Sequence, residues 1–156
     1  MDLRSQLQKY RQEHDEILRF LKVWENALNL AESQQDTERR RGLADLREME
    51  KTFERIRQHS NEEEENLESP YGLYLEDGAL QKLGEEHELL IRWNSDFCRE
   101  LRFATIVRTD EVVALGRQLL EMLRHHIVYE EGLLKQIQDE KDAEEKLLLK
   151  YTESAE

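Results

Sequence analysis

Apolar residues recur every three or four positions along nearly the whole chain, and a single proline, Pro70, interrupts the pattern. This spacing gives a helix one apolar stripe and leaves its opposite face to charged side chains. Only six glycines occur in 156 residues, so few positions favour a break in regular structure. The sequence therefore predicts an all-α protein.

Four long amphipathic segments account for most of the chain. We expect helices over about residues 2–32, 37–68, 79–105 and 110–138. Thr109, followed by Asp110 and Glu111, resembles a capped helix start. Residues 139–149 either extend the last helix or form a short extra helix at the C-terminal end. Because short connections favour antiparallel neighbours, the predicted architecture is an up-down-up-down four-helix bundle.

Composition excludes several classes of protein. Acidic side chains outnumber basic ones by 36 to 23, and the resulting net charge of −13 argues against nucleic acid or anionic lipid as a partner. The single cysteine, Cys98, cannot form an intrachain disulfide, and the chain has no apolar run long enough to span a membrane. The amino terminus is polar and unlike a signal peptide. We expect one cytoplasmic domain over residues 1–156, of open oligomeric state.

Four of the five histidines lie on the apolar stripes, one in each predicted helix. They are His14, His59, His87 and His126. One such histidine would be explained by a neighbour that accepts its hydrogen bond. Four buried imidazoles without partners would together cost several kcal/mol, since each unsatisfied polar group costs about 1–3 kcal/mol. His125 lies about 100° round the helix from His126 and is expected on the surface. The four stripe histidines therefore indicate a common site.

Two of these histidines have a glutamate four residues later. Glu63 follows His59 and Glu130 follows His126, so each pair lies on one face of its helix, one turn apart. A buried carboxylate is costly by itself, and a bound dication offsets that cost. The predicted metal ligands are His14, His59, Glu63, His87, His126 and Glu130.

The types of ligand narrow the choice of metal. Nitrogen and oxygen ligands without thiolate suit iron or manganese, whereas zinc prefers a closed set of four ligands and calcium prefers oxygen alone. Two six-coordinate ions need about twelve positions, and the six side chains with a shared oxide or hydroxide bridge fill about ten. The sequence therefore predicts a pair of ions with room for water or a small diatomic ligand.

The order of these residues resembles that of the hemerythrin-like (HHE) cation-binding domain family. The segments HSNEEEENLESP and HHIVYEEGLL are similar to the two His-x-x-x-Glu helices of that family, and the resemblance covers about residues 5–140. It implies a non-haem di-iron site inside the bundle, with Glu63 and Glu130 as bridging ligands. It also implies that His14 and His59 bind one iron, and that His87 and His126 bind the other.

Two positions depart from the oxygen-carrying members of the family. Those proteins have a second histidine one turn after the third-helix histidine, where this chain has Ile91. Their fourth helix has an aspartate five residues after its histidine, where this chain has Glu130 at four. The set is closer to bacterial members with four histidines and two glutamates. The resemblance thus favours redox or peroxide chemistry over reversible oxygen transport.

Three functions follow as hypotheses. The first is a di-iron protein that binds O2 or NO for sensing, storage or protection. The second is a di-iron enzyme with peroxidase, oxidase or iron-centre repair activity, and the third is a metal-free helical interaction module. Among lesser candidates, Tyr10 is expected in the core near the site, Cys98 as a buried inert thiol, and Trp24 and Trp93 as core residues.

Overall fold

The structure, a computed structural model, describes residues 2–68 and 74–155, except for the side chains of residues 60 and 63–68. Within these ranges the chain forms five helices and no strand, so the all-α prediction is confirmed. The helices are α1 (Leu3–Glu32), α2 (Asp36–Glu48), α3 (Glu50–Glu68), α4 (Ala79–Phe103) and α5 (Asp110–Ser154). None of these helices has the length and apolar character needed to cross a membrane.

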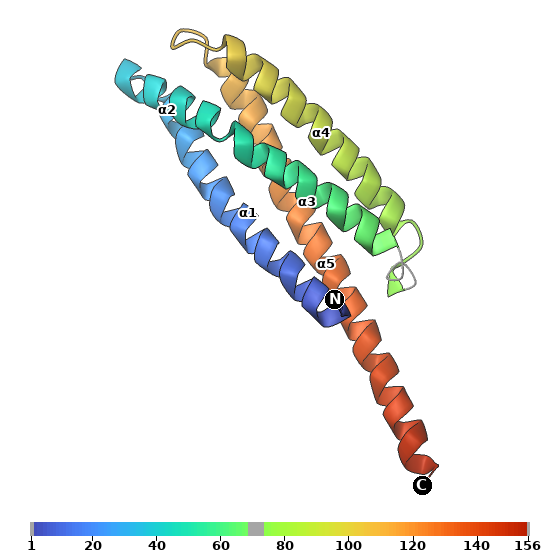
Figure 1. Cartoon of the computed structure of the whole chain (residues 1–156). Helices are drawn as coiled ribbons and strands as arrows, with labels where there is room; N and C mark the ends of the chain where they lie inside the picture. The colour runs from blue at the N-terminus through green and yellow to red at the C-terminus, as the bar shows by residue number, and fades with distance from the viewer. Residues whose placement is uncertain (1, 69–73, 156) are drawn as a thin grey trace.

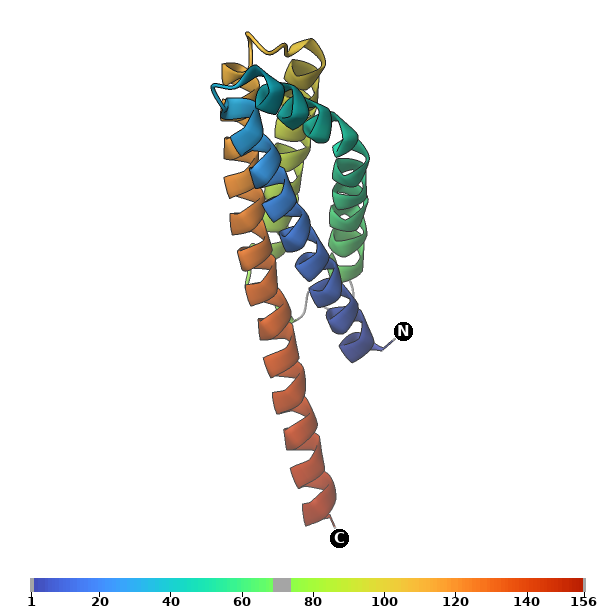
Figure 2. The same cartoon turned by 90° about the vertical axis from the view of Figure 1, so that its left-hand side faces the viewer.

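The long helices lie lengthwise beside one another, and α2 passes over one end of the group (Figures 1 and 2). α1 contacts α2 and α5, and α4 contacts α3 and α5. The first and third predicted helices match α1 and α4 to within two residues. Side chains from α1, α3, α4 and α5 can therefore meet between the helices.

The second predicted helix, over residues 37–68, is wrong in one respect, because the chain turns at Met49. The N–H of Met49 donates to the carbonyl of Asp45 at 3.1 Å, and the carbonyl of Met49 accepts from the N–H of Thr52 at 2.9 Å. α2 buries Gly42 against α1, whereas α3 buries Phe53 in the main apolar cluster. The turn at Met49 thus separates a segment that packs on α1 from a segment that packs on α4.

The last helix settles the question left open for residues 139–149. α5 continues without a break to Ser154, so these residues extend the helix and form no separate one. At 1.5 Å per residue its length is about 65 Å, and its C-terminal turns project past the other helices (Figure 2). The predicted start of this helix is confirmed, with Asp110 and Glu111 in its first turn, but the side-chain cap is not formed. Thr109 precedes the helix as expected, but its side chain makes no capping hydrogen bond.

Two apolar clusters fill the interior, one on each side of the level of the histidines. The larger contains Trp24, Phe53 and Phe97, whose rings meet edge to face, with centroids 4.7 Å apart for Trp24 and Phe53. The smaller contains Leu7 and Leu134. Trp24 is buried as predicted, and Trp93 is partly buried against the larger cluster. A layer of polar side chains thus lies between two dry regions.

Gly42 allows the closest approach between α1 and α2. A Cβ atom at this position would lie 2.4 Å from the backbone nitrogen of Ala31 and 2.7 Å from the carbonyl oxygen of Ala27. We expect Gly42→Ala to lower the free energy of unfolding by about 2 kcal/mol, because overpacking costs about 1–3 kcal/mol and here the neighbour is backbone. The measurement is urea denaturation followed by circular dichroism.

Gly132→Ala is the matched control for Gly42→Ala. Gly132 also lies in a helix, but nothing would come within 4 Å of its added Cβ. The better helix propensity of alanine should therefore raise stability by up to about 1 kcal/mol. Equal effects of the two substitutions would contradict the packing proposed for Gly42.

Candidate metal centre

The four stripe histidines are buried at one level of the helices, as the sequence predicts. They come from four different helices: His14 from α1, His59 from α3, His87 from α4 and His126 from α5. The exposed fraction of each is between 1% and 9%. Four helices therefore each contribute one imidazole to the polar layer between the apolar clusters.

Glu130 of α5 is the centre on which these side chains converge. Its exposed fraction is 1%. His14 Nε2 lies 2.7 Å from Glu130 Oε2, and His87 Nε2 lies 3.0 Å from Glu130 Oε1. His126 Nε2 also contacts Oε1. One carboxylate thus contacts imidazole nitrogens from three helices, and each of its two oxygens faces a different side.

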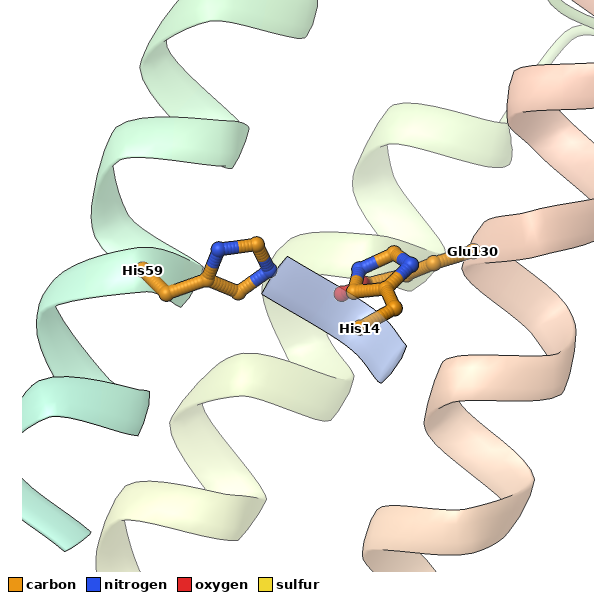
Figure 3. A group of neighbouring side chains, drawn as sticks. All are labelled: His14, His59 and Glu130. Atoms are coloured by element: carbon orange, nitrogen blue, oxygen red, sulfur yellow. The ribbon is translucent and has the colours of Figure 1, made fainter. Parts of the chain in front are cut away.

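The ligand atoms form two groups that share Glu130. One group contains His14, His59 and Glu130, which Figure 3 shows approaching one another from α1, α3 and α5. The other contains His87, His126 and Glu130. In each group one ligand atom per residue lies within 4.8 Å of the others. The imidazoles are paired accordingly, with ring centroids 5.0 Å apart for His14 and His59 and 4.6 Å for His87 and His126.

The structure brings together five of the six predicted ligands. The sixth is Glu63, whose position in α3 is one turn after His59. Its side chain lies outside the described residues. The role of Glu63 as a second carboxylate ligand therefore stays a prediction.

Three further carboxylates contact the outer nitrogens of the histidines, and none of the three was predicted from the sequence. The pairs are His14 Nδ1 with Glu131 Oε1 at 2.6 Å, His126 Nδ1 with Glu86 Oε2 at 2.7 Å, and His59 Nδ1 with Glu13 Oε2. Each pair joins two different helices. The only sequence signal is that each glutamate is adjacent to a predicted ligand, which in a chain so rich in glutamate has little weight.

These outer contacts determine the tautomer of each neutral ring, and therefore which ring nitrogen presents a lone pair to the centre. An ionised carboxylate only accepts hydrogen bonds, so Nδ1 of His14 donates to Glu131 and Nδ1 of His126 donates to Glu86. In a neutral imidazole the other nitrogen, Nε2, then carries no proton. Nε2 of both rings faces Glu130, which also presents lone pairs. Neutral rings around an ionised carboxylate would therefore bring lone pairs against lone pairs.

A positive charge between the Nε2 atoms and the Glu130 oxygens removes this repulsion between lone pairs. In the absence of metal, bound protons supply that charge. Burial opposes ionisation of Glu130, but the hydrogen bonds from His126, His14 and His87 hold the pKa of this carboxyl well below its usual range. Burial also lowers the pKa of His126, but contacts with Glu130 and Glu86 outweigh it and raise that pKa overall. A dication can take the place of these protons, and the imidazole and carboxylate donors suit iron or manganese. The residues present thus fit a metal site.

Comparison with known proteins adds no relative to this description. No protein-family model, no curated protein and no solved structure matches the chain. The function must therefore be argued from the residues themselves.

Of the remaining candidates, Tyr10 and His125 lie where they were expected, whereas Cys98 is less buried than predicted. Tyr10 is buried one turn before His14, with its ring centroid 6.1 Å from that of His59. His125 is exposed on α5. Cys98 is half-buried and packs against the larger apolar cluster, far along α4 from His87. None of the three belongs to the two metal-ligand groups.

Cys98 should be a slow nucleophile in the folded protein. Burial, followed by the negative charge of Glu50, raises the pKa of its thiol from 9.0 to about 11. Because the thiolate is the reactive form, alkylation by iodoacetamide at pH 8 should be at least about tenfold slower than in the unfolded chain. The rate should keep rising with pH towards 11. Native and urea-unfolded protein with equal rates at pH 8 would contradict this account of the thiol.

Proposed function

We propose that this chain is a hemerythrin-like protein that holds two iron ions between α1, α3, α4 and α5 and uses them to bind O2 or NO. The observation that supports this most strongly is the convergence of imidazole Nε2 atoms on one buried carboxylate, Glu130, with outer carboxylates at Nδ1. Manganese is the alternative metal. We infer that the helices form an up-down-up-down four-helix bundle, with α2 and α3 together as its second member.

Each residue has a definite part in this proposal. Glu130 would be the ligand shared by the two ions, since it belongs to both metal-ligand groups. His14 and His59 would hold one ion, and His87 and His126 would hold the other. Glu63 would be the second bridge, from its position one turn after His59. The bound pair would supply reversible one-electron changes at each iron and open positions for a small ligand.

The protein around the site fixes the histidine rings and keeps water away along the direction of the helices. Glu13, Glu86 and Glu131 accept hydrogen bonds from Nδ1, which orients the rings and increases the electron density at Nε2. The apolar clusters on the two sides of the polar layer exclude water there, which strengthens the electrostatic contacts within the layer. These features support a binding or sensing role.

The direct test loads the protein with Fe(II) without oxygen and titrates it with NO or O2 while recording the visible spectrum. We expect a spectral change that saturates with ligand and that His126→Ala abolishes. Circular dichroism of the variant shows whether its helices remain. Rapid consumption of hydrogen peroxide without a stable ligand complex would favour the di-iron enzyme instead. A protein that binds no metal would refute the proposal and leave the helical interaction module.

A further inference from the structure

A small cavity lies beside His87, between α3, α4 and α5. Its volume is about 30 Å³. Its buried lining residues include Phe53, Leu119 and Leu123, together with His87. The outer part of the lining includes Ile91, with an exposed fraction of 37%. The cavity therefore connects the exposed side of α4 with one ligand of the metal centre.

The size and chemistry of this cavity select a class of ligand. A water molecule needs about 10–15 Å³ of such space, so the cavity has room for about two water-sized molecules or one diatomic molecule. Apolar side chains form most of its wall, and a charged ligand would lose its hydration there without gaining partners. The polar lining residues besides His87 are Arg57, which donates to Glu54 at 3.1 Å, and Asn94. An uncharged diatomic molecule fits this space best.

The other half of the centre has a different environment. A larger hollow of about 370 Å³ lies beside His59 between α1 and α3. Charged side chains, among them Glu13, Glu16 and Arg55, share its lining with apolar ones such as Phe20. A wide and partly charged hollow of this kind admits water and ions and selects less for an apolar molecule. The contrast between the two hollows gives the two metal-ligand groups different surroundings.

We propose that the cavity beside His87 is the entry site for an uncharged diatomic ligand, which reaches the metal held by His87 and His126 from the face between α3 and α4. Ile91 stands at its outer end and controls its width. The inference rests on the proposed function, because it needs a metal at these two histidines. Beyond that function, the inference states which half of the centre receives the ligand and by which route. It also names Ile91 as the residue that limits the rate of entry.

Ile91→Trp should narrow this route. In the iron-loaded protein we expect stopped-flow binding of NO to slow by about tenfold, because entry would then wait for the larger side chain to move. Ile91→Ala should speed it. Leu89→Trp is the matched control, since Leu89 has almost the same exposed fraction, 38%, on the same helix but does not line the cavity. An unchanged rate in Ile91→Trp, with iron bound, would overturn the inference.

Xenon provides a readout that does not depend on ligand binding by iron. Xenon is uncharged and enters apolar cavities. In NMR spectra of the protein as purified, we expect xenon to shift the methyl signals of Leu119 and Leu123, and Ile91→Trp to abolish the shifts. Shifts confined to other parts of the protein would overturn the inference. Absence of bound metal would instead refute the proposed function, and this inference with it, so metal analysis of the same sample separates the two failures.

Discussion

Glu130→Gln is expected to remove both metal ions from the protein. Glutamine has nearly the same shape, but it lacks the negative charge and one of the two acceptor oxygens that face the two histidine pairs. Because one residue serves both groups, we expect the iron content to fall from two ions per chain to nearly none. The thermal midpoint of the iron-loaded sample should fall as well, because metal binding is linked to folding.

The control for this substitution is Glu121→Gln. Glu121 lies on the same helix, and its side chain is 63% exposed in an ion pair with Arg124. It should keep the full iron content. Circular dichroism of metal-free Glu130→Gln shows whether loss of iron follows from loss of helix. A folded Glu130→Gln variant that still holds two irons would contradict the bridging role.

Glu86→Gln is expected to weaken metal binding by about 10–100-fold, the usual effect of removing an outer hydrogen-bond partner of a histidine ligand. Glu86 accepts from Nδ1 of His126 at 2.7 Å and so fixes the nitrogen that faces the centre. A neutral amide can keep the position filled, but it orients the ring less strongly. Competition with a chelator of known affinity measures the change.

The neighbouring Glu85→Gln is the matched control for Glu86→Gln. Glu85 is exposed and accepts a hydrogen bond from Gln81 on its own helix. Its replacement should leave the affinity unchanged. If both variants bind metal equally well, Glu86 has no part in holding His126 for the metal.

The sequence predicted the helices well where the apolar spacing was uninterrupted. It missed the turn at Met49 because the spacing continues across it: Leu46 and Phe53 are seven residues apart, as on one face of a single helix. The segment before the turn packs on α1, where Gly42 lies close to the backbone of Ala27 and Ala31. Spacing alone gives no sign of it.

The sequence predicts those site residues whose position is determined by the apolar stripe of their helix. His14, His87 and Glu130 lie on apolar stripes, so burial of the stripes brings them inward. The outer carboxylates lie beside the stripes, and their contacts depend on how far apart neighbouring helices lie. Ile91 is a residue for which position on a stripe does not predict burial. Its spacing places it on a stripe, but it lies at the edge of the packed region and is partly exposed.

The metal content of the protein as purified tests the central claim most directly. Elemental analysis against protein concentration should give two irons per chain, or two manganese ions, with visible absorption in the ferric state if iron is bound. Metal-free protein that remains fully folded and takes up no iron or manganese on reconstitution would contradict the claim. The buried imidazoles and Glu130 would then be a polar layer neutralised by protons alone.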